Sequence, residues 1–390
     1  MSASSRKTPP AELASSTSVL LGSAFLLSVL GLFQVFSATL PRAVLGARDV
    51  DGMGMRQAAF LAAASGLCWA FARFDHRRLV ALAPRALPLL WIVLAVVLVL
   101  PPVNGARRWL QIGPFGLQAS EVAKPLVVLL AAWYGVWRND EIASFRRGFL
   151  PAALGLAVTV VLVAAEPDFG TSIFLIVVGG LVLFLAGMRL RHMLGSALAV
   201  VPFFLAVMIG HFEHVMSRLQ TFRDGPHEQV QRALEVMASG GLVGRGPGAG
   251  QAPLWFVPYV ETDFIFASIG EQFGLAGELA VLGLFLLFLV QGFRIALFAR
   301  RKDSFLLAFG LTFMVGFQAL LNMSVVTGLV PPKGIGLPFV SYGGSSLLML
   351  GCTVGILLNI ARTTPKERGP AYVDRSNKRS KKSLQTSRRK

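Results

Sequence analysis

The stretch "PPKGIGLPFVSYGGSSLL", Pro331 to Leu348, combines prolines, glycines, a lysine and hydroxyl side chains next to long apolar segments. Proline removes a backbone donor and glycine weakens a helix, so the stretch cannot be regular helix throughout. At membrane depth, such backbone is tolerated only where it is buried in protein or lines a cavity. The stretch therefore predicts a polar cavity wall, with a simple hinge at Pro331 and Pro332 as the alternative.

The composition limits the fold to a membrane protein. The chain has 390 residues, of which 54% are hydrophobic and only 15% charged, and its mean hydropathy is +0.63. These values exclude a water-soluble core with a charged shell. Cys68 and Cys352 both lie inside apolar runs, so we expect packing residues rather than a disulfide framework or a thiolate metal site.

Apolar runs long enough to cross about 30 Å of hydrocarbon recur along the chain. We predict an all-α, polytopic integral membrane protein with about ten transmembrane helices and a large extracytoplasmic loop between helices 7 and 8. The eighth run is overlong and contains Gly270, Gly274 and Gly277, which predicts a broken or re-entrant helix facing a cavity. The spans are expected near 17–40, 55–73, 84–103, 121–137, 148–165, 171–188, 193–211, 263–297, 304–328 and 341–361.

The distribution of Lys and Arg predicts the orientation. Basic residues are concentrated in the short loops that would share a side with both termini, which places both termini in the cytoplasm. Residues 1–16 form an N-terminal tail, 17–362 the membrane domain, and 363–390 a disordered basic tail. The net charge of +17 suits anionic lipid and needs no nucleic acid. No nucleotide-binding G-x-x-x-x-G-K-[ST] loop is present, so any transport would be secondary or passive.

Polar residues from separate segments are expected to meet on the outer face, where charge at helix ends is costly. Each cluster has a simpler interpretation: Glu121 and Lys124 could neutralise one another, Glu166 and Asp168 could be exposed loop acids, and the glycine-rich part could be a flexible turn. Together they favour a functional site. The clusters are "NGARRWLQIGPFGLQASEVAK" (Asn104–Lys124), "EPDFGTS" (Glu166–Ser172), "QVQRALEVMASGGLVGRGPGAG" (Gln229–Gly250), "VPYVETDFIFASIGEQ" (Val257–Gln272) and the opening stretch.

Asp263 is the strongest candidate for a general base. It begins the run "DFIFASIGEQ", so its carboxylate should lie at the membrane surface with partial loss of hydration. That environment raises the pKa of a carboxyl group and suits a general base. The structural alternative is that Thr262 or Asp263 caps the eighth helix.

These segments, together with "QALLNMSVVTGLVPPKGIGLPFVSYGGSSL", resemble the SEDS family of bacterial shape, elongation, division and sporulation proteins, the FtsW, RodA and SpoVE group. The resemblance covers residues 17–362. It implies a peptidoglycan glycosyltransferase that polymerises lipid II on the outer face of the bacterial cytoplasmic membrane with a class B penicillin-binding transpeptidase. By the same resemblance, the family's essential aspartate falls on Asp263, its Glu and Lys of the fourth helix on Glu121 and Lys124, and its acidic turn on Glu166 and Asp168.

The sequence departs from the family pattern at Glu261, Gln272 and Gly336. The motifs look most like FtsW, which implies septal synthesis in cell division and other divisome membrane proteins as partners. A RodA-like role in elongation, with elongasome partners, stays open.

The resemblance implies an inverting displacement in which Asp263 accepts the proton of the acceptor hydroxyl. The leaving pyrophosphate needs cations, and the opening stretch adds hydroxyl groups. A Mg²⁺ or Mn²⁺ ion held by Asp263 with another acid is an alternative that we leave open. A lipid II flippase is the rival function, and a scaffold without catalysis ranks third. The candidate phosphate and sugar ligands are Arg107, Arg108, Lys124, Arg218, Arg223, Lys333, Ser341, Tyr342 and Ser345.

Overall fold

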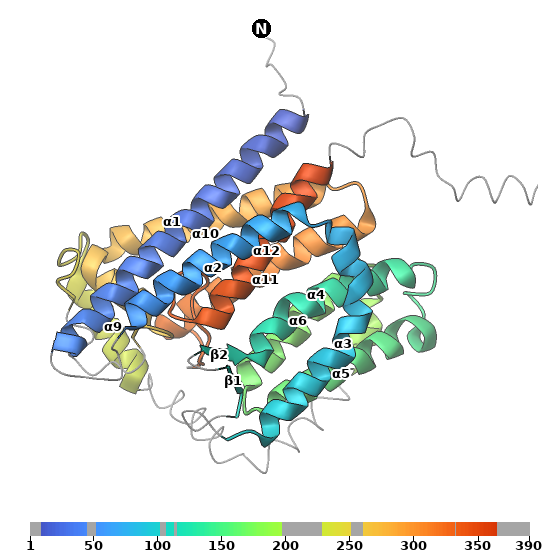
Figure 1. Cartoon of the computed structure of the whole chain (residues 1–390), viewed down its shortest axis with the longest axis horizontal. Coiled ribbons are helices and arrows are strands. Elements are labelled where there is room, and N and C mark those ends of the chain that lie inside the picture. Colours follow the sequence, from blue (N-terminus) through green and yellow to red (C-terminus); the bar gives the residue numbers. More distant parts are fainter. Residues whose placement is uncertain are drawn as a thin grey trace, which may run out of the picture.

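Long apolar helices dominate the computed structural model, which describes residues 9–44, 52–101, 107–112, 115–196, 228–250, 260–331 and 333–364 (Figure 1). A single hairpin of two short strands accompanies them in the described residues. The elements are α1 (Pro9–Val44), α2 (Met53–Arg73), α3 (His76–Val99), β1 (Trp109–Ile112), β2 (Phe115–Gln118), α4 (Ala119–Trp137), η2 (Phe145–Phe149), α5 (Leu150–Ala165), α6 (Phe169–Leu185), α9 (Glu228–Gly240), α10 (Ile265–Phe298), α11 (Lys302–Val326) and α12 (Gly344–Thr363).

The helices confirm the predicted membrane fold. Within the described residues, 7 helical segments are long and apolar enough to cross a membrane, and α6 is a shorter apolar helix. Large apolar side chains such as Phe25, Leu89 and Leu279 are exposed on the outside of the bundle, where lipid would cover them. Most of the predicted seventh span, 193–211, and much of the predicted loop that follows lie outside the described residues.

Several predicted boundaries were wrong. Helix α3 begins at His76, not near 84, because the Asp75 side chain accepts a hydrogen bond from Arg77 N at 3.0 Å and caps the helix before its apolar part starts. Helix α12 begins only at Gly344, so Ser341 lies outside it. The antiparallel hairpin β1–β2 was not predicted.

Two hydrophobic cores hold the bundle together. The smaller core lies among α3, α4, α5 and α6 and contains Leu94, Ala123, Val163 and Leu175, all fully buried. The larger core joins α1, α2, α4, α6, α9, α10, α11 and α12. In Figure 1 the hairpin lies at the lower end of the bundle, between the starts of α4 and α12.

The predicted break in the eighth run is confirmed at Gly274, whose φ of 64° and ψ of −166° interrupt α10. A helix break leaves N–H and C=O groups without helical partners. Here the glycine-rich loop 241–246 after α9 satisfies groups on both sides of the break, so this part of the segment is an ordered clamp and not a flexible turn. The hydrogen bonds run from Arg245 N to Glu271 O (2.9 Å), Gly246 N to Gln272 O (3.1 Å), Leu275 N to Gly241 O (3.0 Å) and Ala276 N to Leu242 O (3.1 Å).

We expect Gly244→Ala to lower the thermal unfolding midpoint in detergent much more than Gly246→Ala. Both glycines have positive φ, 86° and 106°, so alanine strains the backbone at both, at about 1–3 kcal/mol. A Cβ at Gly244 would also overlap the Gln272 carbonyl, whereas nothing lies within 4 Å of one at Gly246. Equal unfolding midpoints for the two variants would contradict the role of loop 241–246 in holding the break in α10.

Candidate active site

The polar segment before α12, residues Lys333–Gly343, is hydrogen-bonded to the turn before α10, residues 260–264. The acceptors are successive backbone carbonyls of that turn. Donors from the segment and from α11 reach all of them, so the two irregular stretches fix one another. The hydrogen bonds run from Tyr342 N to Glu261 O (2.9 Å), from Ser341 Oγ to Thr262 O, and from Asn322 Nδ2 to Asp263 O (2.8 Å).

Two amide side chains of α11 hold the other side of this segment. Asn322 Nδ2 also donates to Ile335 O at 2.8 Å, and Gln318 Nε2 donates to Gly336 O at 3.0 Å. The two amides lie one helical turn apart and therefore face the same way. Neither amide was predicted, although two amides spaced four residues apart in the apolar run "QALLN" were the available signal.

Asp263 is half-buried, and its carboxylate lies beside the exposed Gly334. A Cβ built on Gly334 would be 3.2 Å from Asp263 Oδ2. Loss of hydration raises the pKa of Asp263 to about 6; the charge of Arg108 lowers it, and the charges of Asp168 and Glu261 raise it. The helix-cap interpretation is wrong, since α10 starts after Phe264 and has no side-chain cap.

The acids of the turn between α5 and α6 are buried, so the exposed-loop interpretation is also wrong. Asp168 caps α6 by accepting from Thr171 N at 3.0 Å and from Thr171 Oγ1 at 2.9 Å. Both carboxylate oxygens of Glu166 are buried without a hydrogen-bond partner among the described residues. Burial, with the charge of Asp168 added and that of Arg108 opposed, raises the pKa of Glu166 to about 8. Glu166 is therefore mostly neutral at pH 7.

Arg108 and Lys333 supply positive charge to the same region. The charge of Arg108 acts on both Asp263 and Glu166, and its Nε is buried without a partner in the described part of the chain. Lys333 lies over the start of α6, with its Cδ 3.6 Å from the Cβ position of Gly170. Burial lowers the pKa of Lys333 and the charge of Asp168 opposes this shift. Cations and acids from four separate segments thus share one site.

Lys124 and Glu121 form the ion pair that their spacing predicted. Lys124 Nζ donates to Glu121 Oε1 at 2.6 Å, and the Lys124 side chain is only 5% exposed. The same ammonium donates to Gln318 Oε1 at 3.1 Å, and Gln318 in turn holds Gly336. The pair is therefore a buried link between α4, α11 and the polar segment, and not only a neutralised surface pair.

Other predicted ligands have different surroundings. Ser341 Oγ donates to Thr262 O and accepts from Leu337 N, and Ser345 Oγ donates to Gly116 O and accepts from Gln118 N. Their hydroxyl protons are thus already used to hold the segment and the hairpin. The backbone of Tyr342 has the same anchoring role, and the exposed Arg107 donates to Leu98 O at 3.2 Å. Arg218 and Arg223 lie outside the described residues.

The arrangement of the acids bears on the predicted Mg²⁺ or Mn²⁺ ion. Among the residues that the structure describes, no group of three His, Cys, Asp or Glu side chains is arranged to hold an ion. The charges of Asp168 and Glu261 raise the pKa of Asp263, so the three acids lie in one region. Such an effect does not by itself mean that their oxygens surround one ion. An ion held by Asp263 with one other acid therefore stays a prediction.

The fold and site define a polytopic membrane protein with a polar site of acids and cations at one end of its helical bundle. The family model of FtsW, RodA and SpoVE, described as cell cycle protein, matches residues 17–366. The chain belongs to this family.

Curated relatives cover most of the chain. A protein of Geobacter metallireducens named "Probable peptidoglycan glycosyltransferase FtsW" is 33% identical over 354 residues, which are 88% of this chain and 94% of the relative. Stage V sporulation protein E of Bacillus subtilis is 36% identical over 279 residues, 69% of this chain and 76% of that one.

Solved structures share the fold. A chain from a structure described as "Structural coordination of polymerization and crosslinking by a peptidoglycan synthase complex" matches with a TM-score of 0.72 and 27% identity, covering 91% of this chain and 98% of that chain. The rod shape determining protein RodA of Thermus thermophilus matches with a TM-score of 0.64 and 27% identity, covering 88% and 96%. The resemblance inferred from the motifs is confirmed.

We expect Lys124→Met to destabilise the protein by about 3–5 kcal/mol, because it leaves Glu121 as an uncompensated charge in a nearly buried place. Arg138→Met is the matched control, since Arg138 and Glu141 have the same spacing but are about one-third exposed. Its cost should be about 0–1 kcal/mol. Urea unfolding in detergent measures both.

The double variant Glu121→Gln/Lys124→Met should recover part of the loss. A double variant less stable than Lys124→Met would show that the buried charge of Glu121 is not the cause.

Proposed function

We propose that this chain is a peptidoglycan glycosyltransferase of the FtsW type that polymerises lipid II, with Asp263 as general base. The observation that carries the proposal is the half-buried Asp263 carboxylate, with a pKa of about 6, in a site that also contains cations. At neutral pH such a group is ionised yet basic enough to accept a proton. The names of the curated relatives support the same activity.

The proposed reaction is a single displacement with inversion. A sugar hydroxyl of the acceptor attacks the anomeric carbon of the donor, and the bond from that carbon to the pyrophosphate oxygen breaks. Asp263 takes the hydroxyl proton as the new glycosidic bond forms. The electron pair of the broken bond leaves on undecaprenyl pyrophosphate, whose negative charge must then be stabilised.

Arg108 and Lys333 are the proposed partners of this pyrophosphate. Arg offers a planar fork for phosphate oxygens and Lys a point charge. The lowered pKa of Lys333 reflects a costly burial of its charge, which an anionic ligand would relieve. A neutral Glu166 adds a hydrogen-bond donor without repelling the phosphates.

We place the site on the outer face of the bacterial cytoplasmic membrane. In Figure 1 the start of α1 and the end of α12 lie at the upper end of the bundle, and the hairpin lies at the lower end. The basic loops that predict cytoplasmic termini therefore put the hairpin and the polar segment outside. The expected partner is a class B penicillin-binding transpeptidase at the division septum, which agrees with the structural neighbour from a peptidoglycan synthase complex.

Asp263→Asn should abolish glycan polymerisation while keeping substrate binding. A general base acts in the chemical step, and its loss costs about 10²–10⁴-fold in rate. The assay uses purified protein with its transpeptidase partner and lipid II in detergent, where flipping across a membrane contributes no signal. Asp140→Asn, an exposed acid in the turn after α4, is the control.

Wild-type protein that makes no polymer beside an active partner would favour the flippase instead. Normal polymer from Asp263→Asn would move the base to another acid, with Glu166, Asp168 and Glu261 next in line.

The rate should fall as the pH drops through about 6, because only the ionised Asp263 accepts a proton. Arg108→Gln removes a charge that lowers the pKa, so the midpoint of this acid limb should move up. Asp168→Asn removes a charge that raises the pKa, so the midpoint should move down. Polymerisation rates from pH 5 to 8 measure both shifts, and movement in the same direction would contradict the assignment.

A further inference from the structure

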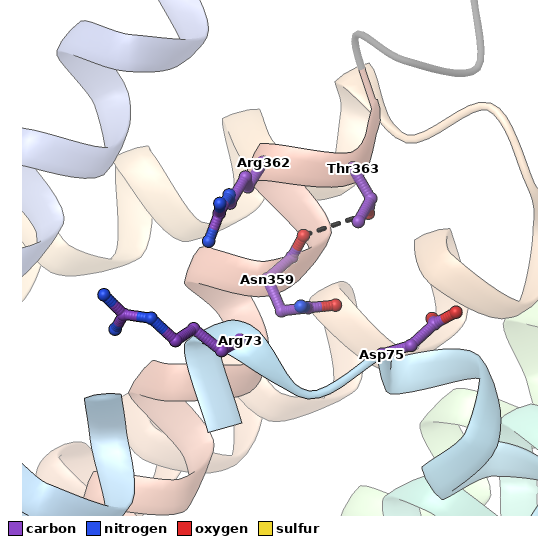
Figure 2. Close-up of a pocket in the computed structure, with 5 residues that line it drawn as sticks. All are labelled: Arg73, Asp75, Asn359, Arg362 and Thr363. Carbon is purple, nitrogen blue, oxygen red and sulfur yellow. Dashed lines mark hydrogen bonds between the residues drawn. The ribbon is translucent and has the colours of Figure 1, made fainter. Parts of the chain in front are cut away.

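A second polar site lies at the end of the bundle away from Asp263. It is a pocket of about 310 Å³ where the end of α2, the start of α3 and the end of α12 meet (Figure 2). Helix α12 starts directly after the polar segment, and helix α2 starts near it, since Gln57 Nε2 donates to Ser341 O. A helix of about 20 residues is about 30 Å long, so the pocket is separate from the candidate active site. Its lining residues are Arg73, Asp75, Asn359, Arg362 and Thr363.

The floor of the pocket is built from satisfied polar groups. Asn359 Oδ1 accepts from His76 N at 3.1 Å and lies 2.8 Å from His76 Nδ1, while Asn359 Nδ2 donates to Ala72 O at 3.1 Å. Thr363 Oγ1 donates to Asn359 O at 2.9 Å. These donors are already used within the chain. A ligand in the pocket must therefore be recognised by the arginines.

The two arginines supply positive charge that no acidic side chain of the described residues pairs with. Figure 2 shows the guanidinium groups of Arg73 and Arg362 extending on the same side of the pocket, with Asp75 on the other side. In the part of the chain that the structure describes, no acidic side chain forms an ion pair with either arginine. Asp75 already accepts from Arg77 N as the cap of α3. Arg73, Arg362 and Asp75 together give the lining one net positive charge, which suits a ligand with one negative charge.

The surroundings of Arg73 point to the membrane surface. Its guanidinium lies over the Trp69 ring, 3.9 Å from the ring centroid, and Trp69 is 62% exposed. Tryptophan at the end of a transmembrane helix typically lies at the level of lipid headgroups. Basic pockets between transmembrane helices at this level bind anionic headgroups. Arg73, stacked on Trp69, would thus lie at the depth of the lipid phosphates.

We propose that this pocket binds the phosphodiester headgroup of an anionic phospholipid between Arg73 and Arg362. A phosphodiester carries one negative charge, which matches the net charge of the lining, and its oxygens fit the guanidinium fork. Inorganic phosphate shares this chemistry. The lipid is favoured because the stacked Arg73 and exposed Trp69 lie together on the outside of α2.

The test is native mass spectrometry of the delipidated full-length protein with phosphatidylglycerol added. Arg73→Gln/Arg362→Gln should weaken phosphatidylglycerol binding by at least about tenfold, since charge-assisted hydrogen bonds to both arginines are lost. Arg78→Gln/Arg189→Gln removes the same charge from exposed arginines outside the pocket and should bind like the wild type. Phosphatidylglycerol should also raise the unfolding midpoint of the wild type more than that of the pocket variant.

Equal binding by the pocket variant and the wild type would overturn the proposal, as would equal binding of phosphatidylethanolamine, which has no net charge. Displacement of phosphatidylglycerol from the wild type by millimolar inorganic phosphate would overturn the lipid assignment and give the pocket to a soluble phosphate. Polymerisation by the pocket variant is measured separately, so that a failed active-site hypothesis does not affect this result.

Discussion

The hydrogen bonds from Tyr342, Ser341 and Asn322 to the carbonyls of residues 261–263 are the contact on which the site depends. The segment from Lys333 to Gly343 has no regular secondary structure of its own and lies between α11 and α12. Irregular backbone in a membrane protein is stable only when its polar groups are satisfied by protein or water. Here the two irregular stretches satisfy one another, and as a result the Asp263 carboxylate is held beside Gly334.

The same rule explains the broken α10. The groups freed at Gly274 are bound by the loop after α9, and Gln272 just before the break is held by Gln34, Ser37 and Ser268. Gln272 is one of the departures from the family pattern, and in this buried place an amide can donate and accept at once. The departure therefore fits its surroundings. The first part of α10, which follows Asp263 directly, is fixed at both of its ends.

The sequence was sufficient for the helical membrane fold, the break at Gly274 and the Glu121–Lys124 pair, because hydropathy, glycine spacing and helical periodicity are local signals. It was not sufficient for the hairpin, whose strands are only 4 residues each, or for the start of α3. It also missed Gln318 and Asn322, since their importance comes from a segment that approaches them in space. The hydroxyls of Ser341 and Ser345 were predicted as substrate ligands, but both donate to backbone carbonyls of the chain. Sequence alone cannot tell whether a donor is already used in this way.

The electrostatics of the site follow from the different charges that act on two similar groups. Asp263 and Glu166 are both carboxylic acids influenced by Arg108 and Asp168, yet the pKa of Asp263 rises only to about 6 and that of Glu166 to about 8. Burial raises the pKa of both acids, but for Asp263 the lowering by Arg108 is larger than the raising by Asp168, whereas for Glu166 the raising by Asp168 is the larger of the two. At neutral pH one acid is thus ionised and the other mostly neutral. In the proposed reaction, this division leaves Asp263 able to accept a proton, while Glu166 adds no negative charge of its own beside the pyrophosphate.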